Sequence, residues 1–485
     1  MSGRSSDRRR GRRGIAVITM SLLMAVVVLP LVGLAIDGSI LYLVQAKLSA
    51  AVDAAALAAA RSLSVGVDLS SQTASATATA QSFFSANFPT GYWNTTNLSM
   101  STAVAQTAYK TRTVTMQASV SVPLTFMRLL GQPQSTVVAQ GQTSRRDVVM
   151  ILVIDRSSSI ANAGVCATMT AAAQNFTNYF ANGRDTIGLV TFMDGYNLTY
   201  APTLNFKSNT PSLSTVIGGI QCYGDTGTAG ALNQGYAQLK AVNLPGALNL
   251  IVFFTDGHPN GIAANFPVKT QVDTRYDYQN TGSSVSTPAS GCTTTTTIQG
   301  EIAQWSGEPA PSTGVTEGLF AVTSSSATTT SEQVASGLSG CAMSSNQSKM
   351  RRDVAYIPAT DLYGNATTGY QSAVGLTYPG GNPYAGQIRV DMPTAVVTAS
   401  VNAADNQATT IRNDPNLIPV IYAIGLGGTS AEPIDATFME RMSNDPRSPI
   451  YDSTKPAGQY FYSPTATDLG DVFQQVASEI LRISQ

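Results

Sequence analysis

The chain has 485 residues, which is enough for two or three domains and a substantial core. Only 12% of its residues are charged and the net charge is −1, so the composition excludes a strongly basic nucleic-acid-binding protein and a strongly acidic one.

The chain begins with a basic tail, residues 1–13, and an uncharged apolar segment, residues 14–36. As an α-helix the segment would be about 34 Å long, enough to cross a hydrocarbon core of about 30 Å. Pro30 is expected to kink or loosen this helix. Since arginines favour the cytoplasmic side, we expect a single-pass anchor with everything after Asp37 on the outer side. A cleavable signal peptide ending near residues 33–35 is the alternative, but its apolar region would be unusually long.

Residues 37–63 are rich in alanine, and nothing from Ser39 to Leu63 breaks a helix, which predicts a helix that continues from the membrane segment. Two roles for it stay open. It is either a stalk, or a surface of small residues, within 39–63, through which copies of the chain associate.

The pattern Gly33-x-Ala35-x-Asp37, followed by Gln45 and an alanine-rich run with Asp53, resembles TadE/TadG-type proteins of Flp (tight-adherence) pilus assembly. The resemblance implies a bacterial inner (cytoplasmic) membrane location, with the bulk of the chain periplasmic or on the cell surface. It also implies other pilus-assembly proteins as partners. Processing in this group usually involves a glutamate five residues after a glycine, whereas Thr19 follows Gly14 at that distance, so we expect the anchor to be retained.

Residues 64–146 predict a small α+β module. A short helix is expected over about 72–87. The run 114–122 alternates apolar and polar residues, as a half-exposed strand does.

A seven-residue apolar run, 148–154, is followed by Asp155, Ser157 and Ser159. This pattern predicts a buried parallel strand that opens into a polar loop. Ligands of open α/β sheets bind outside the carboxyl ends of the strands, which is where this loop would lie. The alternative is that the serines only cap a helix that begins near Ile160.

Two later segments decide between these interpretations. Thr226 lies in the loop 224–228, before a predicted helix over 228–242, and the apolar run 248–254 ends in Thr255-Asp256-Gly257. The three segments, in this order, resemble the metal-ion-dependent adhesion site (MIDAS) of von Willebrand factor A-type domains.

By this resemblance Ser157, Ser159 and Thr226 would bind a metal through their hydroxyls, and Asp155 and Asp256 directly or through water. Three hydroxyls and two carboxylates form a hard, all-oxygen set that suits Mg²⁺, or Mn²⁺. The resemblance also implies one coordination position open to an acidic side chain of a protein or surface ligand.

The rest of the chain alternates predicted helices and strands, so residues 147–485 are expected to form an α/β von Willebrand A-type domain with a doubly wound, mostly parallel sheet. An insertion, about 261–416, interrupts it. Because it follows Asp256, it is either a lid or selectivity element beside the metal, or a variable decoration. The expected elements are helices over 167–180 and 468–483 and strands over 186–193, 198–206 and 417–426.

Four cysteines allow three disulfide pairings in an oxidising compartment. We favour Cys166–Cys222, which would brace the metal loops, and Cys292–Cys341, which would close the insertion. Zinc binding gains little support, since the sequence has no Cys-x-x-Cys.

The single histidine, His258, limits the catalytic hypotheses. It lies two residues after Asp256, in a segment that the metal site already explains, and no phosphate-binding Gly-Lys-Ser/Thr loop is present. We therefore predict no catalytic and no organic-cofactor site, and no enzyme.

The preferred interpretation is a membrane-anchored envelope protein of Flp pilus assembly whose A-type domain binds a ligand through Mg²⁺. The alternative is a structural pilus or filament subunit packed through its N-terminal helix, with the A-type domain as a passive scaffold. A cytoplasmic chelatase-type partner of an ATPase also uses such a domain, but the membrane segment argues against it.

Overall fold

A computed structural model gives the fold, and it divides the chain into two compact units, residues up to Arg145 and residues from Arg146 on. The structure describes residues 17–63, 69–108, 111–275, 283–285, 296–305, 315–330, 349–350, 353–427 and 434–483.

The first unit packs two helices on a three-stranded sheet of order β1-β2-β3. Its elements are η1 (Met24–Val28), α2 (Leu29–Ser62), α3 (Leu69–Asn87), η2 (Tyr92–Asn94), β1 (Thr96–Ala108), β2 (Thr111–Pro123), η3 (Met127–Leu130) and β3 (Gln134–Arg146). One face of β2 is buried, as the alternation of apolar residues predicts. Its valines pack against Leu48 and Val52 of α2 and Phe84 of α3.

The alanine-rich half of α2 is not an isolated stalk. Ala51, Ala55, Ala56, Ala59 and Ala60 are almost completely buried in the core of this unit. Their small side chains let α3 and the sheet approach closely, so the small-residue face that one of the two interpretations assigned to association of copies is covered within the unit itself.

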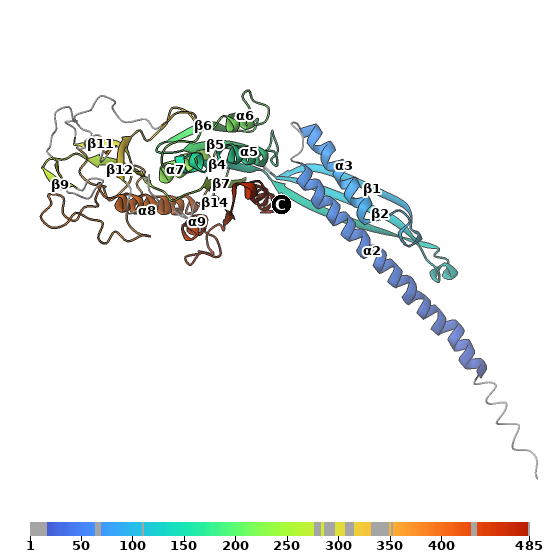
Figure 1. Cartoon of the computed structure of the whole chain (residues 1–485). Coiled ribbons are helices and arrows are strands. Elements are labelled where there is room, and N and C mark those ends of the chain that lie inside the picture. Colours follow the sequence, from blue (N-terminus) through green and yellow to red (C-terminus); the bar gives the residue numbers. More distant parts are fainter. Residues whose placement is uncertain are drawn as a thin grey trace, which may run out of the picture. The chain divides into compact units, whose positions relative to one another are not determined.

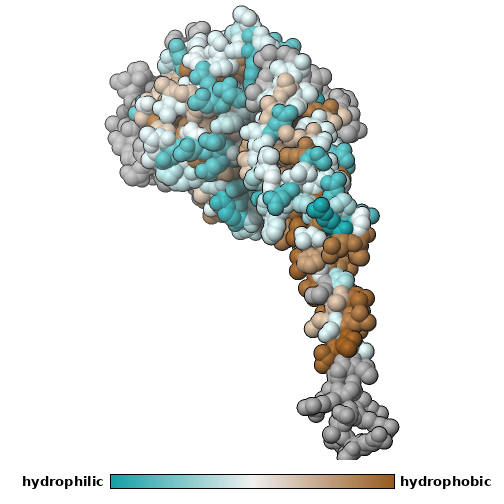
Figure 2. All heavy atoms as spheres, turned by 90° about the vertical axis from the view of Figure 1, so that its right-hand side faces the viewer, coloured by the Kyte–Doolittle hydropathy of each residue, from teal (hydrophilic) through white to brown (hydrophobic). Residues whose placement is uncertain are grey.

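The first half of α2 and the turns before it are exposed and apolar, as Figure 2 shows. The continuous helix Val17–Ser62 is long and apolar enough to cross a membrane, by length and composition. A π-helical turn, η1, lies just before Pro30. Proline has no N–H and clashes with the carbonyl four residues earlier, so the expected loosening takes the form of this wider turn.

The second unit is built on a six-stranded sheet of order β15-β14-β7-β4-β5-β6. All neighbouring strands are parallel except β6, which runs antiparallel to β5. The prediction of a mostly parallel α/β sheet is confirmed. Its strands are β4 (Val148–Asp155), β5 (Thr186–Phe192), β6 (Tyr196–Thr203), β7 (Leu248–Thr255), β14 (Val420–Leu426) and β15 (Gln459–Ser463).

Helices cover both faces of this sheet (Figure 1). Successive side chains of β4 point to opposite faces of the sheet: Val148 and Met150 to one face, and Val149 and Ile151 to the other. One face packs against α5, α6 and α10, and the other against α7, α8 and α9. The helices are α4 (Ser158–Asn162), α5 (Cys166–Thr177), α6 (Leu213–Gly218), α7 (Thr228–Val242), α8 (Pro393–Arg412), α9 (Ala436–Ser443), η4 (Ala466–Asp468) and α10 (Leu469–Ile483).

The segment between β7 and β14 contains the insertion expected over about 261–416, and its described residues form regular secondary structure. It holds a second sheet of order β13-β12-β11-β8 and a two-stranded ribbon. Helix α8 also lies in it, and since parallel strands need a crossover connection, we assign α8 to the A-type fold itself. The strands are β8 (Gly261–Pro267), β9 (Asp273–Arg275), β10 (Ser283–Val285), β11 (Thr297–Trp305), β12 (Val315–Phe320) and β13 (Lys349–Met350).

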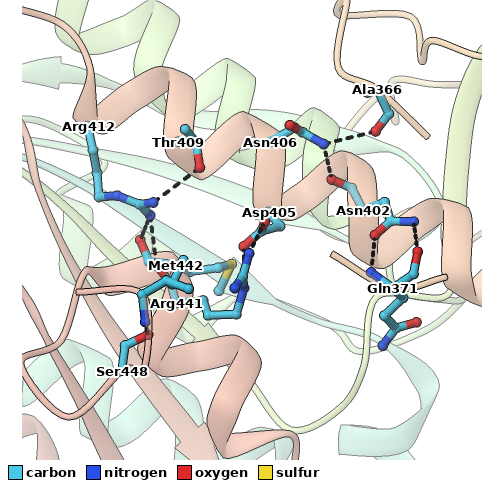
Figure 3. A network of polar contacts seen from close by, with 11 residues as sticks. Ala366, Gln371, Asn402, Asp405, Asn406, Thr409, Arg412, Arg441, Met442 and Ser448 are labelled. Carbon is cyan, nitrogen blue, oxygen red and sulfur yellow. Dashed lines mark hydrogen bonds and ion pairs between the residues drawn. The ribbon is translucent and has the colours of Figure 1, made fainter. Parts of the chain in front are cut away.

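Polar contacts hold α8 in place (Figure 3). Asp405 forms an ion pair with Arg441 of α9, with N and O 2.8 Å apart. On the same helix the Asn402 side chain accepts from the N–H of Gln371 and donates to its carbonyl. Hydrogen bonds therefore attach the segment around Gln371, which precedes α8 in the chain, to this helix.

Candidate metal centre

The candidate ligands meet because their strands are neighbours. β4 and β7 are parallel and in register, with Ile154 opposite Phe254. The next residues along each strand, Asp155 and Thr255-Asp256, therefore leave the sheet at the same edge, as expected for the carboxyl ends of parallel strands.

Hydrogen bonds connect four of the five predicted ligands, all except Thr226. The Ser157 and Ser159 hydroxyl oxygens lie 2.9 Å apart, and the Ser159 hydroxyl donates to Asp256 Oδ1 at 2.7 Å. Asp155 lies behind them, fully buried. Its Oδ1 accepts the Ser157 N–H at 2.8 Å and its Oδ2 accepts the Thr255 hydroxyl at 2.6 Å.

The spacing of these oxygens fits a small hard cation. Around Mg²⁺ in octahedral geometry, with metal–oxygen distances of about 2.1 Å, neighbouring ligand oxygens lie about 3 Å apart. The distances of 2.9 Å and 2.7 Å from Ser159 to Ser157 and Asp256 match that edge. The same distances are those of ordinary hydrogen bonds between oxygens, so the hard, all-oxygen chemistry of the donor set is what suits Mg²⁺.

Thr226 lies in an adjacent loop that backbone hydrogen bonds hold. The Ser158 N–H donates to the Gly224 carbonyl at 2.7 Å. The Thr226 N–H donates to Asn260 Oδ1 at 2.6 Å, and the Thr226 carbonyl accepts the Gly261 N–H at 3.2 Å. Thr226 is 4% exposed. In the described part of the chain, its hydroxyl takes no part in the hydrogen bonds that join the other candidates.

Burial raises the pKa of Asp155 to about 6, although hydrogen bonds from Thr255 and Ser157 and the charge of Arg156 act in the opposite direction. A carboxylate that has lost its hydration is stabilised by a nearby positive charge. A divalent cation at this place would supply one.

Arg156, which no sequence pattern singled out, connects the metal loop to the long β7–β14 connection. Its side chain is fully buried. Its guanidinium donates to the carbonyls of Gln221, Ser326 and Thr329 at 3.0 to 3.2 Å, and contacts Ser324 Oγ at 3.4 Å. We call residues 321–330 the strap. Because Arg156 directly follows Asp155, the strap is tied to the metal loop.

Replacing Arg156 by leucine should release the strap. The Ser324 N–H, which donates to the Tyr196 carbonyl at 2.9 Å, should then exchange its hydrogen at least about tenfold faster, since hydrogen bonds from a charged donor contribute roughly 1.5 to 3 kcal/mol. Native-state hydrogen exchange measures this. Amides of β7 are the internal control, and equal acceleration there would indicate general destabilisation.

Buried carboxyl groups lie beside the threonine loop. The Asp225 N–H donates to Asp194 Oδ1 at 2.7 Å, and burial together with Asp194 and Glu317 raises the pKa of Asp225. Burial also raises the pKa of Glu301, whose Oε1 lies 2.2 Å from where a Cβ on Gly227 would be. Among the described residues, no group of three or more His, Cys, Asp or Glu side chains could hold a metal ion, so we assign none here.

The Cys166–Cys222 disulfide is present, as predicted. It links the start of α5 to the segment that leads to the threonine loop. Cys292 and Cys341 lie outside the described residues.

The comparisons with known families agree with both resemblances. Residues 150–258 match the model of the von Willebrand factor type A domain. Residues 15–62 match the TadE/G-like family of Flp pilus assembly. No curated protein matches the sequence.

Several solved structures are similar at low identity. The vWF domain of the type V pili tip protein Mfa5 from Porphyromonas gingivalis is 16% identical, with 70% of this chain and 97% of that chain covered and a TM-score of 0.36. The PilB minor pilin from Streptococcus sanguinis is 12% identical, with 81% and 80% covered and a TM-score of 0.35.

The pilus adhesin SpaC from Lactobacillus rhamnosus GG is 13% identical, with 80% of this chain covered and a TM-score of 0.35. This chain spans about a third, 34%, of the length of SpaC.

Proposed function

We propose that this chain, a TadE/G-like protein with a von Willebrand factor type A domain, is a membrane-anchored protein of Flp pilus assembly that binds an acidic protein or surface ligand through Mg²⁺. The two family matches support a pilus-related protein. The observation that carries the ligand-binding role is the meeting of the Ser157, Ser159 and Asp256 oxygens at 2.7 to 2.9 Å, with Asp155 buried behind them.

In this proposal Ser157, Ser159 and Thr226 hold Mg²⁺ through hydroxyls, and Asp155 and Asp256 hold it directly or through water. When bound there, the cation would offer one coordination position to a carboxylate oxygen of the partner. The chain's own residues orient the site: Thr255 and the Ser157 N–H fix both oxygens of Asp155. Preformed ligands lower the entropy cost of binding.

The role is binding and not catalysis. His258, which is partly exposed, follows Asp256 by two residues in the loop after β7. We propose that it lies at the rim of the site and does not act as an acid or base. The proposal also places the protein in the bacterial inner membrane, single-pass, with the A-type domain outside the cytoplasm.

The test is calorimetric titration of Mg²⁺ and Mn²⁺ into the full chain in detergent. We expect saturable binding to the wild type and none to the Asp155→Ala, Asp256→Ala double variant, with circular dichroism unchanged. Asp471→Ala, which removes an exposed carboxylate of α10, is the control and should bind like the wild type. A wild type that binds neither metal would contradict the metal-bridge mechanism.

The alternative is a filament subunit that associates through residues 39–63, with the A-type domain as a passive scaffold. The burial of the α2 alanines within their own unit argues against it. Cysteine crosslinking along the exposed positions of that segment separates the two, since specific crosslinks between copies are expected only for the subunit.

A further inference from the structure

A short loop joins β2 to β3 and carries two exposed leucines. In η3, Leu129 is 84% exposed and Leu130 is 69% exposed. Arg128, also exposed, precedes them. We call residues 124–133 the leucine loop. Adjacent large apolar side chains with a cation beside them are typical of segments that enter a membrane interface.

The leucine loop is fastened to α2 at the end of the apolar segment. The Asp37 carboxylate, 1% exposed, accepts three consecutive backbone N–H groups, from Thr125 at 3.1 Å, Phe126 at 2.9 Å and Met127 at 2.7 Å. Three hydrogen bonds to one ionised group hold the loop in a defined position.

One turn earlier on α2, Gly33 makes room for the loop. A Cβ on Gly33 would lie 2.4 Å from the Phe126 ring, so only glycine permits this contact. Since α-helices rise about 1.5 Å per residue, Gly33 is about 6 Å further into the apolar segment than Asp37. The exposed apolar residues Leu31, Val32 and Leu34 surround that level of the helix.

The loop is therefore level with the last turns of the helix that leaves the membrane, and its leucines continue the apolar surface of that helix. We propose that the leucine loop enters the lipid leaflet that α2 leaves, with Leu129 and Leu130 among the acyl chains and Arg128 at the phosphate level. The loop and the helix form a two-point attachment of the first unit to the membrane. This inference rests on the membrane anchoring proposed above.

The test uses the full chain in phosphatidylcholine/phosphatidylglycerol vesicles, with Trp93 and Trp305, its two tryptophans, replaced by phenylalanine. Leu129→Trp then reports on the loop. We expect its fluorescence to be quenched by lipids brominated on the acyl chains. The matched control is Ala105→Trp, an exposed position of β1 opposite Thr113. Thr113 is eight residues, about 27 Å, from Ser121, which lies on the same strand close to the leucine loop. A tryptophan at position 105 should therefore not be quenched.

A tryptophan at a third position tests membrane anchoring of the helix separately from insertion of the leucine loop. Leu23→Trp lies in the apolar half of the helix and is 54% exposed. Quenching at Leu23→Trp without quenching at Leu129→Trp would overturn the inference and leave the anchoring intact. Absence of quenching at both would overturn the anchoring and the inference. A blue-shifted but unquenched Leu129→Trp would show that protein covers the loop, and would also overturn the inference.

A pair of glycine variants tests the attachment to α2. Gly33→Leu should push Phe126 away and reduce the quenching of Leu129→Trp to near the control. Gly38→Leu is matched to it, because a Cβ on Gly38 meets nothing within 4 Å, and should leave the quenching unchanged. Equal quenching in both variants would contradict a position set by Gly33.

Discussion

Replacing Ser159 by alanine should lower the Mg²⁺ affinity of the full chain at least about a hundredfold. Residues that only hydrogen-bond to a metal's ligands already contribute about 10- to 100-fold to metal affinity, and Ser159 is proposed to be a ligand itself. The Ser159 oxygen lies between those of Ser157 and Asp256, at 2.9 Å and 2.7 Å, so its loss removes the middle of the ligand set. Calorimetric titration gives the affinity.

Ser158→Ala is the matched control for this variant. Ser158 is the neighbouring residue and equally a serine, but it contributes to the site through its N–H, which donates to the Gly224 carbonyl and is kept in alanine. The Mg²⁺ affinity should then equal that of the wild type. Equal affinities of the Ser158 and Ser159 variants would show that the Ser159 hydroxyl is no metal ligand.

Removal of the Cys166–Cys222 disulfide should destabilise the A-type domain by about 4 kcal/mol, the chain-entropy value for a loop of this length. The two cysteines are 56 residues apart in the sequence. The Cys166→Ser, Cys222→Ser double variant avoids an unpaired thiol. Denaturant unfolding, followed by the near-ultraviolet signal of the domain, measures the free energy of unfolding.

The same variant should bind Mg²⁺ more weakly, because Cys222 lies two residues before Gly224, which holds the metal loop through Ser158. Saturating Mg²⁺ should accordingly recover part of the lost stability, since a ligand that binds only the folded state stabilises it. An unfolding free energy within about 1 kcal/mol of the wild type would contradict the bracing role.

The parts of the fold that could be predicted from the sequence are those whose pattern lies within one short segment of the chain. β4 and β7 are uninterrupted apolar runs that end in polar residues, and both are completely buried. The helix Thr228–Val242 has the predicted bounds. A resemblance that depends on three short segments also placed Asp155 and Asp256 correctly at neighbouring strand ends.

The features that the sequence did not predict depend on contacts between distant residues. Helix α8 was missed because it is rich in Ala, Thr and Asn, and many of its polar residues are buried against the connection before it. Arg156 occupies a variable position of the motif, and only the fold brings Ser326 and Thr329 to it. Likewise, no local pattern places Glu301 of β11 against Gly227.

The position of β4 has a mechanical consequence for a membrane-anchored protein that binds a ligand as proposed above. Because the chain enters this sheet at Val148, a pull on a ligand bound at Asp155 is resisted from the opposite end of the same strand. Along its length β4 is hydrogen-bonded to β5 on one side and to β7 on the other. The load is therefore shared by both ladders at once, in shear, and does not open them bond by bond as peeling an edge strand would.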